Sequence, residues 1–231
     1  MEYQGYPEGA VIGSRFMYKV YGWMSFALAV TAAVAYYLFR TQVLFHYLMT
    51  HSMALLGLII LQFALVFILV FYMFRMSYIT ALALFTVYAA SLGITMSSVF
   101  FVYTTSSIYL TFLITAGMFA GMSVYGYFTK SDLTSVGSFA GMALWGIIGA
   151  MLLNFWFRSG TFDYVISIIG VIVFVLLTAY DTQKIKQMGQ RFATDQEGRK
   201  KVALLGALTL YLDFINLFLF LLRFTGNQRE S

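Results

Sequence analysis

No cysteine occurs among the 231 residues, and this absence excludes disulfides, thiol nucleophiles and thiolate metal sites. The two histidines, His46 and His51, fall in one segment between apolar runs, so a Ser-His or zinc site has little support. Residues 202–222 contain no lysine, which disfavours a retinal-type receptor built on a Schiff base. We therefore predict a protein that is not an enzyme and that holds no resident cofactor.

Charged residues are also scarce, at 10% of the chain against about 25% in soluble domains, and there is one proline. Hydrophobic residues make up 61%, and the mean hydropathy is +0.83. The apolar runs are long and unbroken, which favours helices over a barrel. The predicted fold is an all-α, polytopic membrane protein, a bundle of seven transmembrane helices at residues 16–39, 52–74, 79–102, 107–128, 133–157, 164–185 and 202–222.

The predicted organisation is a short tail at residues 1–15, a seven-span domain at 16–223 and a short tail at 224–231. Ten of the 14 basic residues fall on the N-terminal side of the membrane, which places the N-terminus in the cytoplasm and the C-terminus outside. The bases lie in loops beside spans, so we expect a lipid bilayer as the partner and no nucleic acid. The short tails favour a bacterial cytoplasmic (inner) membrane.

Three ionisable residues depart from simple flanking positions, namely Arg75, Asp181 and Asp213. Asp213 is about ten residues from either end of its apolar run, which puts its carboxylate roughly 15 Å deep in a bilayer. An acid at that depth costs at least about 2.5–3.5 kcal/mol on insertion scales, so it should face protein or water and have a partner. It is therefore the leading functional candidate.

Helical spacing predicts two polar seams that can face each other. One carries Asp213 with Gly206, Thr209 and Asn216, and the other carries Asp181 with Ser167, Gly170, Phe174 and Thr178. Two carboxyl groups at short range cannot both ionise cheaply and tend to share a proton. Contact requires the seventh helix to tilt or to begin before the membrane. The alternatives are that Asp181 is a helix-end acid beside Lys184 and that Arg75 is a plain flanking base.

The segment at residues 186–201 predicts such an early start, because acids and bases recur at i,i+4 in the pairs Arg191–Asp195, Asp195–Arg199 and Glu197–Lys201. Small residues at four-residue spacing occur at Gly117 and Gly121, and again at Gly137 and Gly141. We expect both pairs to allow close packing inside the bundle rather than to form a dimer face.

Two segments resemble the Bax inhibitor-1 family, the transmembrane Bax-inhibitor-motif proteins, including bacterial members of the YccA type. They are Ala179-Tyr180-Asp181-Thr182-Gln183-Lys184-Ile185 and the stretch from Leu208 to Phe218, which contains Leu-Asp-Phe-Ile-Asn-Leu-Phe. The likeness covers nearly the whole chain from Phe16 onward. It implies seven helices around a central last helix, an aspartate pair at Asp181 and Asp213 that senses pH, and an arginine latch at Arg75.

In some family members this arrangement accompanies a pH-sensitive calcium leak. We accordingly expect a cation (calcium) leak channel or ion-homeostasis protein. Asp181 and Asp213 would offer weak, transient calcium ligands, and Thr209, Asn216 and Thr178 would line the path. Bacterial relatives are also linked to a membrane quality-control protease, so the alternative is a modulator that acts by protein binding. An intramembrane aspartyl hydrolase is disfavoured by the resemblance.

Overall fold

The computed structural model describes the backbone of residues 8–42, 50–192 and 194–229. Over these residues it contains helices and connecting segments, with no strand beyond one isolated bridge between Tyr103 and Gln228. Seven of the helical segments are long and apolar enough to cross a membrane, which confirms the predicted all-α fold. The helices are α1 (Glu8–Thr41), α3 (Ser52–Tyr72), α4 (Tyr78–Met96), α5 (Val99–Val102), α6 (Thr105–Phe128), α7 (Thr134–Phe157), α8 (Gly160–Arg191) and α9 (Gln196–Thr225).

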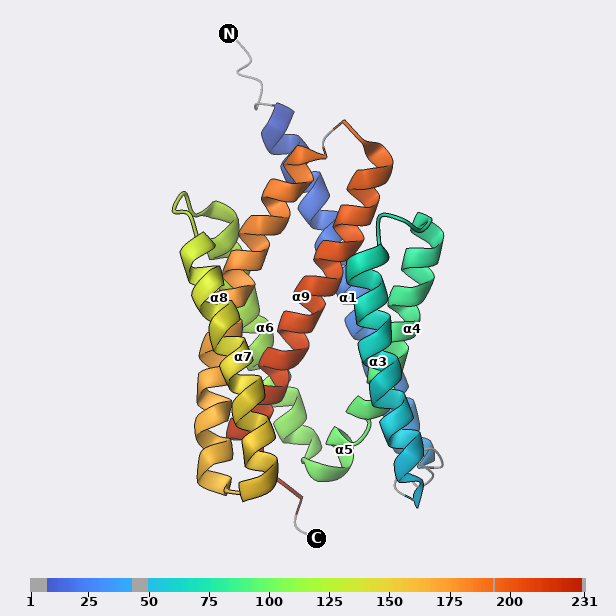
Figure 1. Ribbon diagram of the computed structural model, residues 1–231, viewed down its shortest axis with the longest axis vertical. Coiled ribbons are helices and arrows are strands. Elements are labelled where there is room, and N and C mark those ends of the chain that lie inside the picture. Colours follow the sequence, from blue (N-terminus) through green and yellow to red (C-terminus); the bar gives the residue numbers. More distant parts are fainter. Residues whose placement is uncertain (1–7, 43–49, 193, 230–231) are drawn as a thin grey trace. The chain divides into compact units, whose positions relative to one another are not determined.

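The chain divides into two compact units. Unit 1 comprises Met1–Val102 and Ile185–Tyr211, and unit 2 comprises Tyr103–Lys184 and Leu212–Ser231. The long helices α8 and α9 each contribute to both units, because the division falls inside them (Figure 1). Asp181 and Asp213 belong to unit 2, and Arg75 belongs to unit 1.

The third predicted span is broken near its end into α4 and α5. Its hydroxyl side chains bond to their own helix three residues back: Ser97 Oγ donates to Ile94 O at 2.7 Å, and Ser98 Oγ donates to Thr95 O at 2.7 Å. Such bonds compete with the helical ladder and bend helices. The ladder is accordingly irregular here, with Ser98 N donating to Thr95 O at 3.2 Å.

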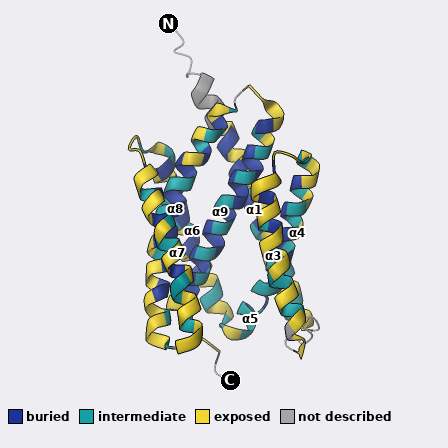
Figure 2. Ribbon diagram, viewed as in Figure 1, coloured by how far each residue is buried: buried dark blue, intermediate teal, exposed yellow. Residues whose placement is uncertain are grey.

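The last helix, α9, supplies core residues to both units. Of its most apolar window, 72% is buried, compared with 11–44% for the other six spans. Figure 2 shows this difference as a largely dark blue α9 beside a mostly yellow and teal α3. A span with so much buried surface is covered by protein, whereas the exposed large apolar side chains on the other spans are suited to lipid. The last helix is therefore the most buried of the seven spans, and it contributes buried residues to each unit.

A buried polar contact ties three helices of unit 1 together. Thr31 Oγ1 on α1 donates to Ala89 O on α4 at 2.9 Å and lies 2.6 Å from the Tyr211 hydroxyl on α9. A threonine has one hydroxyl proton, so Tyr211 is the donor to Thr31. The Tyr211 ring is fully buried and meets Phe85 and Tyr88 edge to face.

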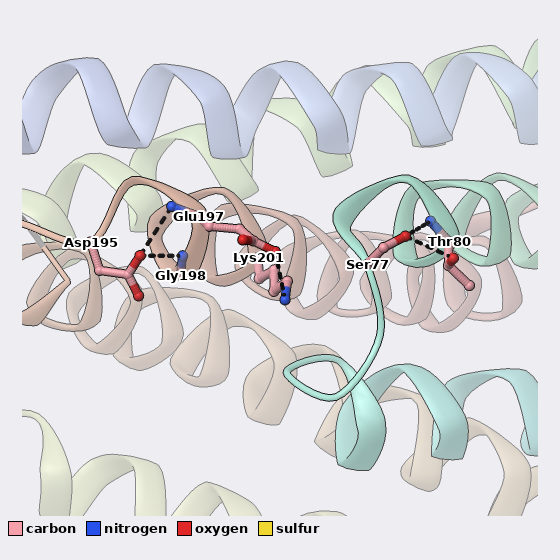
Figure 3. Close-up of polar contacts among 6 residues, drawn as sticks. All are labelled: Ser77, Thr80, Asp195, Glu197, Gly198 and Lys201. Atoms are coloured by element: carbon pink, nitrogen blue, oxygen red, sulfur yellow. Dashed lines mark hydrogen bonds and ion pairs between the residues drawn. The ribbon is translucent and has the colours of Figure 1, made fainter.

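The connection between α8 and α9 corrects part of the predicted charge pairing. Glu197 and Lys201 form the expected ion pair at 3.0 Å, but α8 ends at Arg191 and α9 begins at Gln196, so no helix spans Arg191 and Asp195. Asp195 instead caps α9, accepting from Glu197 N at 3.1 Å and Gly198 N at 3.0 Å (Figure 3). Among the described side chains, Asp195 forms no ion pair with Arg191 or Arg199, so these two predicted pairings are wrong.

Of the glycines at four-residue spacing, only Gly137 packs closely against another helix. An added Cβ would meet no described atom within 4 Å at Gly117, Gly121 or Gly141. Gly137, by contrast, lies directly against the ring of Tyr180 on α8. The prediction that the Gly117–Gly121 pair packs inside the bundle is wrong for the described residues, because this face of α6 is exposed.

We predict that Tyr211→Phe destabilises the protein by about 0.5–1.5 kcal/mol, the range of single hydrogen bonds inside membrane proteins. The ring contacts remain, and only the donor to Thr31 is removed. The midpoint of unfolding of the purified protein in detergent measures the effect. Tyr109→Phe is the matched control, because Tyr109 is 66% exposed. An equal effect from both variants would contradict the assigned role of the hydroxyl.

Candidate functional site

The α8 segment that carries Asp181 is packed tightly against α6 and α7 within unit 2. Gly126 of α6 lies against the backbone of Ala179, and Gly137 of α7 lies against Tyr180. A Cβ at either glycine would collide, so the absence of a side chain there permits this approach.

One turn onward, Gln183 fastens the same segment to the connection between α6 and α7. Its side-chain amide donates to Ser131 O at 2.8 Å, and its carbonyl oxygen accepts from Leu133 N at 3.0 Å. Gln183 is 9% exposed, so both bonds are sheltered from water. The packing and these two bonds together fix the register and rotation of α8 at Asp181.

Asp181 and Asp213 meet side chain to side chain, with their carboxyl groups in hydrogen-bonding contact. Asp213 is 5% exposed and comes from α9, where the next residue, Phe214, packs on Phe112 and Phe119 of α6. A hydrogen bond between two carboxyl groups requires a proton on one of them. The other oxygen, Asp213 Oδ2, has no partner among the described residues.

The helix extents explain how two acids at different distances from their flanking lysines meet. α9 begins at Gln196, six residues before the apolar run, and α8 continues ten residues past Asp181 to Arg191. Asp181 is thus inside a helix, and the alternative of a helix-end acid is wrong. The nearby Lys184 is exposed, with its ammonium 5.5 Å from the centre of the Tyr180 ring.

Two further polar residues of unit 2 were missed from sequence. Ser123 Oγ on α6 and Thr182 Oγ1 on α8 are buried without a hydrogen-bond partner among the described residues. Hydroxyls on helices ordinarily bond to their own backbone, as Thr115 Oγ1 does to Thr111 O at 2.8 Å. No sequence pattern separates the two kinds. Buried polar atoms are ordinarily satisfied, so these two hydroxyls are places where a bound water would find a partner.

The residues predicted to line a path are bonded within their own helices. Thr178 Oγ1 donates to Phe174 O at 2.7 Å, Thr209 Oγ1 to Leu205 O at 3.1 Å, and Asn216 Nδ2 to Leu212 O at 2.8 Å. Thr178 and Asn216 lie in unit 2 with the acids, and Thr209 lies in unit 1. Each keeps free acceptor lone pairs, which suit a passing cation.

The remaining candidates belong to unit 1. Arg75 is exposed in the turn after α3, and its guanidinium stacks over Tyr72 at 5.6 Å from the ring centre. His51 is exposed and lies 3.0 Å from the Thr50 hydroxyl, and His46 falls outside the described residues. Among described residues, no three His, Cys, Asp or Glu side chains gather to hold a metal. Since calcium takes six to eight oxygens, two carboxyls suit weak binding rather than a resident ion.

Seven helices long and apolar enough to cross a membrane define an integral, polytopic helical membrane protein. The family model described as "Inhibitor of apoptosis-promoting Bax1" matches residues 13–230. The chain belongs to the Bax inhibitor-1 family, which confirms the resemblance seen in its motifs.

Bacterial relatives match along nearly their whole length. Inner membrane protein YbhL of Escherichia coli K12 is 51% identical over 215 residues, covering 93% of this chain and 92% of YbhL. An uncharacterized protein of Borreliella burgdorferi is 47% identical over 221 residues, covering 96% and 95%. Uncharacterized protein RP147 of Rickettsia prowazekii is 43% identical over 218 residues, covering 94% and 91%. The family match therefore covers all seven candidate spans that the structure describes.

We predict that Gly126→Ala destabilises the protein by about 1–3 kcal/mol, the usual cost of overpacking, because its Cβ meets the Ala179 backbone and cannot be accommodated by a rotamer change. Gly121→Ala on the same helix is the control, because its Cβ has no neighbour within 4 Å. Unfolding midpoints in detergent compare the two. If both alanines are equally tolerated, α6 and α8 do not pack as closely as described.

Proposed function

We propose that the protein is a pH-sensitive cation leak, permeable to calcium, in which Asp181 and Asp213 form the sensor. The observation that supports this most is the contact of the two carboxyl groups within unit 2, where Asp213 is buried and Asp181 is partly exposed. With two protons the pair is neutral, and with one shared proton it carries a single negative charge. Without a proton it carries two negative charges that repel at short range.

The proposed gating step is loss of the shared proton. Repulsion between the carboxylates then separates α8 from α9 at this level, and water and cations enter beside the exposed oxygens. Arg75 acts as the latch that pairs with the ionised acids, as the family resemblance implies. Lys184, one turn from Asp181, adds a fixed positive charge. The buried hydroxyls of Ser123 and Thr182 support hydration of the same region.

We further propose that the protein resides in a cytoplasmic membrane with its N-terminus inside. The basic residues support this orientation, since ten of 14 fall on the N-terminal side. The E. coli relative is named an inner membrane protein, which supports the location.

Calcium flux into proteoliposomes across pH 5 to 8 tests the sensor, and we expect flux that varies with pH. Asp213→Asn should remove that variation, because an amide neither loses a proton nor repels Asp181. Asp181→Asn should act similarly. Asp132→Asn is the control, because Asp132 is exposed between α6 and α7 and its Oδ1 accepts hydrogen bonds from Thr134 N at 2.9 Å and Thr134 Oγ1 at 2.6 Å. Those bonds hold the pKa of Asp132 below its ordinary value, so it stays ionised throughout the scan.

An unchanged pH response in both Asp213→Asn and Asp181→Asn would contradict the proposal that these acids are the pH sensor. If the protein is folded, as judged by its unfolding midpoint, and passes no calcium at any pH, the proposed leak activity is wrong.

The second candidate function is modulation of a membrane-embedded protease by protein binding. It is favoured by helices that extend beyond their apolar runs, since α1 begins at Glu8 and α9 at Gln196. Such ends offer helical surface to a partner at the membrane edge.

Deleting residues 1–14 should weaken capture of that partner from native membranes while leaving calcium flux unchanged, because it removes the helical surface that begins at Glu8 and keeps the apolar run of the first span. Co-purification from crosslinked membranes, with the full chain alongside, measures this. Identical recovery with and without the tail, or recovery of no protease in either case, would contradict the binding role.

A further inference from the structure

A basic cavity opens in unit 1, where the beginning of α1 meets the beginning of α9. It has a volume of about 230 Å³ and is lined by Phe16, Lys19, Gln196, Arg199 and Lys200. Phe16 is 1% exposed and packs against Gly189 of α8, so one wall is apolar and fixed. The polar lining comes from two segments about 180 positions apart in sequence, which only the fold brings together.

The two acidic residues near the cavity, Asp195 and Glu197, bind other groups than the three basic side chains that line it. The Asp195 carboxylate caps α9, and Glu197 pairs with Lys201 at 3.0 Å (Figure 3). Among the side chains that the structure describes, Lys19, Arg199 and Lys200 have no ion-pair partner. Three positive charges therefore line one cavity with no acidic partner among the described side chains. Lys19 and Lys200 are exposed, so water screens their repulsion in part, and a bound anion would relieve it further.

The donors fit a phosphate group. A guanidinium presents a planar fork that binds two phosphate oxygens, the two ammonium groups add point charges, and the Gln196 amide adds a neutral donor. Guidance of membrane insertion explains why bases lie on this side of the membrane, but it does not explain why three of them converge on one cavity. The cavity also lies where two apolar spans begin, beside the headgroup layer.

We propose that this cavity binds a phosphate group, supplied either by the headgroup of an anionic phospholipid or by a soluble phosphate. Arg199 chelates the phosphate oxygens, Lys19 and Lys200 neutralise its charge, and Phe16 contacts the organic part of an ester. The site is independent of the acid pair, which lies in unit 2.

Lipid retention by the purified full chain tests the proposal. The protein is equilibrated in detergent micelles containing phosphatidylglycerol or phosphatidylcholine, and bound lipid is counted by native mass spectrometry. The pocket variant combines Lys19→Gln, Arg199→Gln and Lys200→Gln. The control combines Arg40→Gln, Lys130→Gln and Arg158→Asn, exposed positions outside the cavity, and also removes three positive charges. Asparagine suits Arg158 because its φ is 49°.

We expect the wild type and the control to retain phosphatidylglycerol in preference to phosphatidylcholine. The pocket variant should bind phosphatidylglycerol at least about tenfold more weakly, since each basic residue near an anionic headgroup contributes roughly fivefold. Arg199→Lys should lie between them, because it keeps the charge but loses the fork. The unfolding midpoint of each variant confirms that it is folded.

Competition with inorganic phosphate, against chloride at equal ionic strength, separates the two sources. Release of lipid by phosphate, or phosphate binding to the lipid-free wild type but not to the pocket variant, identifies a soluble phosphate as a ligand. Lipid retention that phosphate does not displace identifies the headgroup. Equal loss of lipid in the pocket and control variants, or no binding of either probe, would overturn the proposal.

Discussion

Two carboxyl groups in contact inside an apolar core are the constraint around which unit 2 is arranged. Burying one acid is costly, and burying two ionised acids side by side is more so, unless a proton, water or an ion intervenes. The surrounding packing holds the pair in place. Backbone-level contacts at Gly126 and Gly137, and the two bonds of Gln183, leave α8 little freedom to turn Asp181 away. The contact is thus maintained by close packing of neighbouring helices rather than by its own strength.

The helix α9 carries two electrostatic features of opposite sign. Its first turns bring Arg199 and Lys200 to a cavity in unit 1, and its later part brings Asp213 to the core of unit 2. Between them, Tyr211 is held by Thr31 through a buried hydrogen bond of 2.6 Å. All three positions lie on this one helix, although the division between the two units falls between Tyr211 and Leu212. The burial of this helix, at 72% of its most apolar window against 11–44% for the other spans, means that protein rather than lipid covers most of it.

Much of the molecule was predictable from sequence. Long apolar runs with few charges admit only spanning helices, since lipid offers backbone groups no other partner, and seven such helices are found. Asp213 is a candidate from sequence alone, because an acid in the middle of an apolar run is costly to insert into a bilayer and is usually functional. Glu197 and Lys201 pair as their spacing predicts. These features depend on local composition and on a period of 3.6 residues, both of which the sequence determines.

Tertiary structure decided which residues meet. The sequence left open whether Asp181 reaches Asp213, because depth depends on where α9 begins and how α8 is held. Of the four glycines assigned to close packing, the structure uses only Gly137 and adds Gly126, since spacing alone does not reveal which face has a neighbour. The unpartnered hydroxyls of Ser123 and Thr182, and the convergence of Lys19 with Arg199, were likewise invisible. Sequence periodicity defines the faces of each helix, but only packing between distant segments determines what each face contacts.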